Sequence, residues 1–270
     1  NIKASYLFTT KKDYYQKCDL LLNNCLDIVL SPKELRMALK QSLEDKNGNK
    51  FVFLGNIDKF KKLNKKKDNQ SKLKDEKLFS FKNFNLKIFG NINVEINKDN
   101  KIIKFTKKKP NSRVLFYNGQ LKDWKIEFVD LTQDDNKIIS RDVNGLSGCV
   151  NIYDIKIENL KVFIDSAKCE DALNLVRTEG SIVELEIKNS SFDGIDADFS
   201  DLTLDNIKII NSQNDCMDFS YGNYILNNLN LEKCSDKAVS TGESSNLEIN
   251  NFIIKDSIIG IASKDSAVVK

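Results

Sequence analysis

The chain has 270 residues, of which 40% are hydrophobic and 30% are charged, an ordinary balance for a folded protein. Its net charge of +3 gives no reason to expect a nucleic-acid partner, and no apolar run is long enough for a transmembrane span. Histidine is absent, which excludes the commonest general base and the Ser-His and Cys-His nucleophile systems. Any catalysis must therefore use carboxylates, Lys, Tyr, Cys or a hard metal ion.

Residues 1–56 are interpreted as an N-terminal extension that includes a short capping α-helix. The Ser-Pro-Lys-Glu segment at 31–34 is a capping box, with Ser31 as the N-cap. One helical face then carries Leu35, Ala38, Leu39 and Leu43. The helix is expected to end near Lys46, and a strand is expected to begin at Phe51. Such a helix would cover the open end of a repeating β structure.

Nine lysines crowd residues 57–78. The favoured interpretation is a solvated loop, because runs of like charge usually lie on the surface. The alternative is an arm that contacts an anionic polymer.

From residue 79 onward, period-two alternation of apolar residues predicts strands. The predicted strands are Leu86–Phe89, Ile92–Ile96, Ile102–Phe105, Val114–Phe116 and Trp124–Val129. Lys107, Lys108 and Lys109 are interpreted as a basic turn. Residues 131–148 are interpreted as a protruding polar loop, beside which Trp124 and Arg141 line a groove.

From residue 169 to the C-terminus, one pattern recurs about every 22 residues. A first column contains Asp171, Asp193, Asp215 and Asp236. A second column contains Asn174, Asp196 and Asp218 and ends at Val239. Apolar pairs keep the same step at Leu185/Ile187, Ile207/Ile209, Leu229/Leu231 and Phe252/Ile254, as do the small residues Ser190, Ser212, Cys234 and Ser257. Self-similarity of this length is typical of a solenoid.

We therefore predict an all-β fold, a right-handed parallel β-helix that spans residues 79–270 and continues beyond 270. In such a fold alternate side chains of each strand point inward, and equivalent residues of successive coils stack about 4.8 Å apart. Asn206, Asn228 and Asn251 are interpreted as turn residues that precede the strands.

The six cysteines, at positions 18, 25, 149, 169, 216 and 234, contain no C-x-x-C pair and do not resemble a zinc site. We expect them to be reduced core residues, since free cysteine is commonly buried. Cys18 and Cys25 are close enough in sequence to pair, which stays an open alternative.

Three roles are open for the aspartate columns. The side chains can bind backbone amides in solvated turns. Asp171, Asp193 and Asp215 can hold a hard cation such as Ca²⁺. Finally, Asp193, Asp196 and Asp215 can be the acid and base carboxylates of an enzyme that acts on a sugar polymer.

The segments Ser191-Phe-Asp193-Gly-Ile-Asp, Asn214-Asp215-Cys216 and Ser235-Asp-Lys237-Ala-Val-Ser-Thr-Gly resemble the polygalacturonase family, within the pectin-lyase-like superfamily of right-handed β-helices. The resemblance covers about sixty residues and implies catalytic roles for Asp193 and Asp215. Asn214 stands where that family has its general acid, and Lys237 stands where it has histidine. An amide cannot donate the proton, so the resemblance does not imply the family's standard hydrolysis.

Residues 148–270 are similar to bacterial β-helix proteins that occur at cell surfaces or fused to CotH-type spore-coat kinase domains. The likeness rests on Glu170–Arg177, Phe192–Ser200 and Asp236–Ser244. It implies a secreted, periplasmic or surface location, and a polysaccharide or other domains of a longer chain as partners.

Two main functions follow from these patterns, beside a third option, an adhesin stalk like those of phages or toxins. One is a non-catalytic scaffold that binds glycan. The other is a polysaccharide lyase or glycoside hydrolase, in which Asp193, Asp196, Asp215 and Lys237 are catalytic. The expected substrate-binding residues are Arg177, Asp218, Trp124 and Tyr221. No cofactor is expected apart from the Ca²⁺ alternative.

Overall fold

The computed structural model describes residues 76–133 and 146–270, together with two short strands, β1 (Leu43–Glu44) and β2 (Lys50–Phe51). The chain divides into two units, Asn1–Ser71 and Lys72–Lys270. In the first unit β1 and β2 pair antiparallel, so Leu43 lies in a strand and not in the expected helix. The rest of that helix and most of the lysine-rich loop lie outside the described residues.

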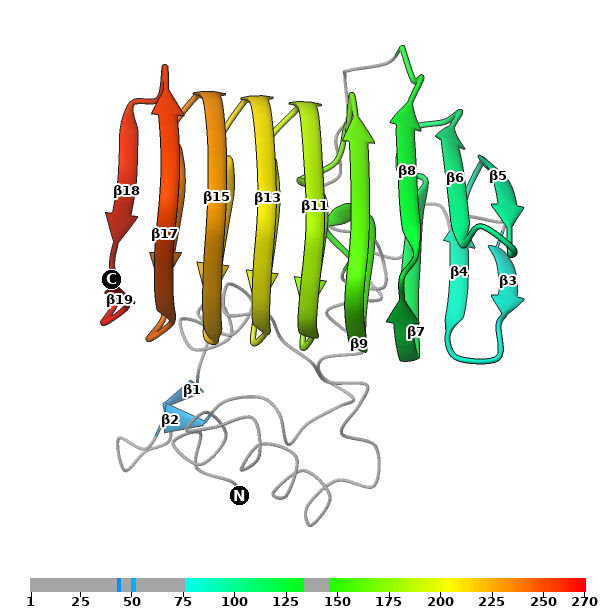
Figure 1. Cartoon of the computed structure of the whole chain (residues 1–270), viewed down its shortest axis with the longest axis horizontal. Coiled ribbons are helices and arrows are strands. Elements are labelled where there is room, and N and C mark those ends of the chain that lie inside the picture. The colour runs from blue at the N-terminus through cyan, green and yellow to red at the C-terminus, as the bar shows by residue number, and fades with distance from the viewer. Residues whose placement is uncertain (1–42, 45–49, 52–75, 134–145) are drawn as a thin grey trace. The chain divides into compact units, whose positions relative to one another are not determined.

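The second unit is an all-β parallel solenoid of about seven coils, with about 22 residues per coil (Figure 1). Its first strands are β3 (Glu76–Ser80), β4 (Asn85–Phe89), β5 (Ile92–Asn97), β6 (Ile102–Lys107), β7 (Arg113–Lys122), β8 (Lys125–Asp130) and β9 (Gly148–Asp165). The next are β10 (Asp171–Val176), β11 (Glu179–Ser190), β12 (Asp193–Asp198), β13 (Asp201–Ser212), β14 (Met217–Ser220) and β15 (Asn223–Cys234). The last are β16 (Lys237–Gly242), β17 (Asn246–Lys255), β18 (Ile259–Ser263) and β19 (Val268–Val269). The described residues contain no helix long and apolar enough to cross a membrane.

Each regular coil contributes one short and one long strand. The short strands β10, β12, β14, β16 and β18 pair in parallel, and so do the long strands β11, β13, β15 and β17. Strand β9 is long enough to pair with both β10 and β11. Figure 1 shows the long strands side by side, and their shared register stacks equivalent side chains along the axis.

The first coils are less regular than the later ones. All five strands expected between residues 86 and 129 are present, but β3–β4, β4–β7 and β5–β6 pair antiparallel. Antiparallel neighbours can be joined by short turns, whereas parallel ones need a full coil between them. The parallel order begins with β6–β8 and β7–β9.

The core consists of stacked aliphatic columns. Leu173, Ile195, Met217 and Val239 are register partners on successive short strands, and all four are fully buried. Burying one such side chain contributes roughly 1.5–3 kcal/mol relative to exposure, and the columns repeat this gain in every coil. One coil cannot bury its inner face alone, so the coils depend on their neighbours.

A corner of each coil requires left-handed backbone. Arg177, Phe199, Tyr221 and Glu243 each follow a short strand, and their φ angles are 53°, 51°, 44° and 48°. That conformation costs roughly 1–2 kcal/mol for a residue with a Cβ. The rings of Phe199 and Tyr221 stack with centroids 4.8 Å apart, and an aromatic pair contributes about 0.5–1.5 kcal/mol, which offsets part of the strain.

The expectation of reduced cysteines is wrong for four of the six. Cys149 bonds to Cys169 and Cys216 bonds to Cys234, at sequence separations of 20 and 18. These separations are slightly shorter than one coil, so each bond joins the two ends of a single turn of the solenoid. The closing of the coil brings the Cα atoms within 5.4 and 5.3 Å, inside the range that a disulfide requires. Cys18 and Cys25 lie outside the described residues.

Candidate functional site

The first aspartate column links neighbouring coils through their backbone. Asp171 and Asp193 are register partners. The Oδ1 atom of Asp193 accepts hydrogen bonds from the Asp215 amide, at 2.9 Å, and from the Asn214 side chain, at 2.6 Å. Asp215 repeats the arrangement, because its Oδ1 atom accepts a hydrogen bond from the Lys237 amide at 2.9 Å. These carboxylates therefore satisfy backbone donors at the start of the next short strand.

In the fourth repeat, strand pairing places different residues in the two columns from those that the sequence alignment predicted. The pairing of β14 with β16 places Ser240 beside Asp218, so Ser240 and not Val239 ends the second column. The same register puts Lys237, not Asp236, in line with Asp215. The 21-residue spacing to Asp236 followed the acidic residue type, whereas the short strands β12, β14 and β16 keep a step of 22.

Asp171 and Asp215 are buried and Asp193, Asp196 and Asp218 are half-buried, and this burial changes their ionisation. Burial raises the pKa of Asp193 to about 7, although hydrogen bonds from Asp215 and Asn214 oppose the change. Burial also raises the pKa values of Asp171 and Asp196 well above the ordinary range, and neighbouring carboxylates raise them further. The pKa of Asp218 is raised in the same way, with partial compensation by Lys264. Protonated carboxyl groups therefore persist here near neutral pH.

Lys237 supplies the positive charge at the end of the first column. Its Nζ atom lies 3.3 Å and 3.4 Å from the two carboxylate oxygens of Asp215, and it also contacts the Asp236 carboxylate. Burial lowers the pKa of Lys237, but the Asp236 and Asp215 carboxylates outweigh it, so the pKa is raised overall. Lys237 is thus an ammonium group and not a general base at neutral pH.

The structure gathers some of the expected site residues and separates others. Asp193, Asp196, Asp215, Asp218 and Lys237 lie on three successive short strands, β12, β14 and β16, or at their starts. The expected binding residues Arg177 and Tyr221 lie at the other ends of the short strands, in the left-handed corner.

Trp124 is the clear correction. It is 9% exposed and packs edge-on against Phe81 and Phe84 in the core, with ring centroids 5.5 and 5.4 Å away. The indole therefore fills space between early coils and does not line a groove. Arg141, its expected neighbour, lies outside the described residues.

The described residues contain no group of three or more His, Cys, Asp or Glu side chains placed to hold a metal ion. Asp193 and Asp215 already use one carboxylate oxygen each for backbone amides.

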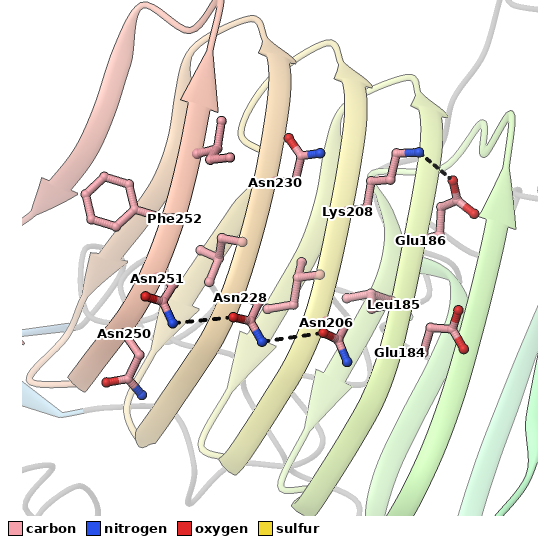
Figure 2. Close-up of a pocket in the computed structure, with 13 residues that line it drawn as sticks. Glu184, Leu185, Glu186, Asn206, Lys208, Asn228, Asn230, Asn250, Asn251 and Phe252 are labelled. Atoms are coloured by element: carbon pink, nitrogen blue, oxygen red, sulfur yellow. Dashed lines mark hydrogen bonds and ion pairs between the residues drawn. The ribbon is translucent and has the colours of Figure 1, made fainter.

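A second polar surface lies on the long strands. A groove of about 690 Å³ crosses the long strands β11, β13, β15 and β17 (Figure 2). Along its floor Asn251 donates to Asn228, and Asn228 donates to Asn206, both at 3.4 Å. We call this surface the asparagine groove; it is lined by Glu184, Leu185, Glu186, Asn206, Ile207, Lys208, Asn228, Leu229, Asn230, Asn250, Asn251, Phe252 and Ile253.

The two ends of the asparagine groove differ. At one end Lys208 pairs with Glu186 at 3.3 Å, and at the other the Phe252 ring is 54% exposed (Figure 2). The column of Asn206, Asn228 and Asn251 is confirmed as a register, but its residues lie inside long strands and not in turns. Sequence reasoning therefore found the column and missed its role as a polar surface.

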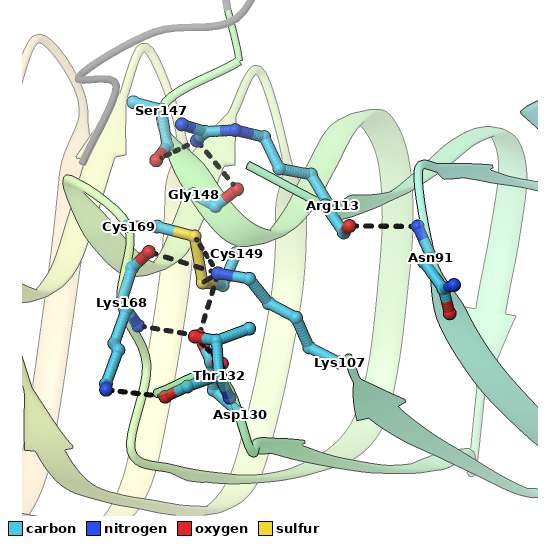
Figure 3. A network of polar contacts seen from close by, with 11 residues as sticks. Asn91, Lys107, Arg113, Asp130, Thr132, Ser147, Gly148, Cys149, Lys168 and Cys169 are labelled. Atoms are coloured by element: carbon cyan, nitrogen blue, oxygen red, sulfur yellow. Dashed lines mark hydrogen bonds and ion pairs between the residues drawn. A yellow bond between two sulfur atoms is a disulfide. The ribbon is translucent and has the colours of Figure 1, made fainter. Parts of the chain in front are cut away.

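A buried polar cluster was also missed (Figure 3). Lys107, expected in a basic turn, is the last residue of β6, and its Nζ atom lies 2.7 Å from the Asp130 carboxylate. Both side chains are completely buried. The signal was present, since Lys107 continues the inward alternation of Ile103 and Phe105.

Comparison with known proteins does not assign the chain to a family. No protein-family model, curated protein or solved structure matches the chain. The likenesses to polygalacturonases and to bacterial surface β-helix proteins therefore rest on the quoted residues alone, and the parallel solenoid is the level of classification that the structure supports.

Proposed function

We propose that this chain is a non-catalytic scaffold of a bacterial surface or secreted protein, and that the asparagine groove binds an extended polysaccharide. The observation that carries the proposal is the groove across four neighbouring long strands. Equivalent amides recur there at the coil spacing of about 4.8 Å. A sugar chain along the solenoid axis would meet a donor and an acceptor at each coil, and Phe252 offers an apolar face for a sugar ring.

The state of the aspartate columns favours binding over catalysis. Asp215 is 3% exposed, so a polymer has little access to it, whereas Asp193 and Asp196 are half-buried. Asp193 and Asp215 hold backbone amides of the next coil, which is a structural task. A catalytic carboxylate must reach the reacting atoms of its substrate.

The two disulfides support the proposed location. Disulfides persist in oxidising compartments such as the periplasm and the cell exterior, and they are rare in the reducing cytosol.

Replacing both Asn228 and Phe252 by alanine is expected to weaken polysaccharide binding about tenfold or more, equivalent to about 1.4 kcal/mol. The change removes the central amide of the ladder and the exposed ring while leaving the core intact. Wild type and variant would be compared by calorimetric titration with polysaccharides selected on a glycan array.

Thr203→Ala is the matched control, because Thr203 lies on β13 outside the asparagine groove and should leave the affinity unchanged. Equal affinities of wild type and the double variant would remove the groove from the proposal. An array with no bound glycan would contradict the function itself.

One observation favours the enzymatic alternative. Asp193, with a pKa of about 7, can donate a proton near neutral pH, and the next coil carries Asp215 beside the Lys237 ammonium group. Two carboxyl groups with different environments are the usual basis for an acid and a base in glycoside cleavage. Lys237 would neutralise a substrate carboxylate in this scheme.

The alternative predicts cleavage of at least one uronic-acid polymer, followed by absorbance of the unsaturated product or by release of reducing ends. Asp193→Asn and Asp215→Asn should each abolish the signal while the far-ultraviolet circular dichroism stays unchanged. If the wild type cleaves none of a broad panel of uronic-acid polymers, catalysis is contradicted. If either aspartate variant stays fully active, the carboxylate that it replaces is not catalytic.

A further inference from the structure

The buried pair of Lys107 and Asp130 holds an amine in contact with a carboxyl group in a site without solvent access. The two residues are register partners at the ends of the parallel strands β6 and β8. Their Nζ and Oδ2 atoms are 2.7 Å apart, and both side chains are inaccessible to solvent. Holding two reacting groups in contact in one orientation can lower the activation barrier by a large part.

We propose that Lys107 and Asp130 form an intramolecular isopeptide bond. The Lys107 Nζ atom attacks the Asp130 Cγ atom, a new C–N bond forms, and one C–O bond of the carboxyl group breaks. The hydroxyl group of the protonated Asp130 carboxyl leaves and takes up one proton from the attacking amine, so one water molecule is released. No oxidant, reductant or other reactant is required.

The starting protonation states are accessible at this position. Moving one proton within the ion pair gives a neutral amine and a neutral acid without changing the total number of protons. Burial favours the uncharged Lys107 amine, because a low-dielectric site disfavours a charged ammonium group. Burial also lowers the pKa of Lys107, although the Asp130 carboxylate opposes the change.

The surroundings of Asp130 would stabilise the reaction intermediate. Its Oδ1 atom accepts hydrogen bonds from the Thr132 amide at 3.0 Å and from the Thr132 hydroxyl at 2.6 Å. Its Oδ2 atom accepts one from the Lys168 amide at 3.0 Å. Donors fixed around a carboxyl group stabilise the negative charge of a tetrahedral intermediate, and the Thr132 hydroxyl can pass a proton to the leaving oxygen.

The cluster also holds the amine in place (Figure 3). Lys107 Nζ donates to the Lys168 carbonyl at 3.0 Å and lies 3.6 and 3.5 Å from the sulfur atoms of the Cys149–Cys169 disulfide. The bond would therefore join β6 to β8 beside a coil that a disulfide already closes. Two covalent links at one position would resist separation of the early coils.

The same two strands contain a natural comparison. Lys104 and Glu127 are also register partners and lie 3.0 Å apart, but their side chains are 52% and 26% exposed. Water solvates both charges there, so the neutral form is not favoured and no condensation is expected.

Mass spectrometry of the purified wild-type chain tests the proposal. After reduction of all disulfides, the intact mass should fall below the sequence mass by one water molecule. Tryptic peptides should include a branched species that joins Lys107 to Asp130. Lys107→Arg keeps the positive charge but cannot condense, and it should show the full sequence mass. Lys104→Arg should still lack one water.

A folded wild-type chain at the full sequence mass would overturn the proposal, as would a water loss that fragmentation places elsewhere. The Asp193-Gly194 dipeptide is the position to examine, because an aspartyl residue before glycine can lose water by cyclising on its own backbone.

Discussion

Lys107→Met is expected to lower the free energy of unfolding by at least about 3–5 kcal/mol, because it removes the charge that pairs with the buried Asp130 and also removes the amine of the proposed isopeptide bond. The substitution keeps an apolar stem of similar length in the core but removes the positive charge that faces the Asp130 carboxylate. Asp130 would keep its hydrogen bonds from Thr132 and Lys168 and lose its counter-charge. Urea unfolding at neutral pH, with the disulfides intact, measures the difference.

Lys104→Met is the control for this prediction, because the exposed Lys104–Glu127 pair lies on the same two strands. Its loss should cost only a small fraction of the Lys107 effect, as is normal for exposed ion pairs. If the two variants were equally stable, the buried pair would have no special role in holding the early coils together.

The second large effect is a dependence of stability on pH that originates in the aspartate columns. The ordinary pKa of the Asp193 carboxyl is 3.8, and burial raises it to about 7 in the folded chain. Between these values the unfolded chain has released the proton and the folded chain still holds it. Stability therefore falls as pH rises from about 4 to about 7, by about 1.4 kcal/mol per pH unit or about 4 kcal/mol in total from Asp193.

Asp193→Asn should remove this contribution. The amide oxygen can still accept the hydrogen bonds from Asp215 and Asn214, and it carries no charge to bury. The variant should match or slightly trail the wild type at pH 4.5 and exceed it at pH 8. Asp201→Asn is an exposed comparison on β13 and should leave the pH profile unchanged. A wild-type stability that rises from pH 5 to pH 8 would contradict the assigned ionisation.

The fold was predictable because the repeat of a solenoid is visible as a repeat in the amino-acid sequence. The apolar residues of the repeats keep a step near 22, and the same partners stack in the structure, as with Leu185 and Ile207 or Ile209 and Leu231. The aspartate and asparagine columns were found by the same step. Their alignment failed by one position at Asp236, because residue type was followed where strand register decides.

The disulfides and the place of Trp124 depend on contacts across the coil. The repeat period along the chain carries no information about those contacts. The disulfides Cys149–Cys169 and Cys216–Cys234 join residues about one turn apart, and no spacing rule in the sequence distinguishes them from buried thiols. Trp124 shows the reverse case, since an aromatic residue expected on a surface instead fills the core between early coils.

The amino-acid sequence alone determined the parallel solenoid, its period and the columns of like residues, because each coil repeats the same inward and outward alternation. The tertiary structure decided what each column does. Burial set the ionisation of Asp193, the meeting of two strand ends paired Lys107 with Asp130, and the stacking of long strands turned an asparagine column into a groove. The physical reason is that dielectric surroundings and hydrogen-bond partners come from neighbouring coils, which the order of residues along one coil does not specify.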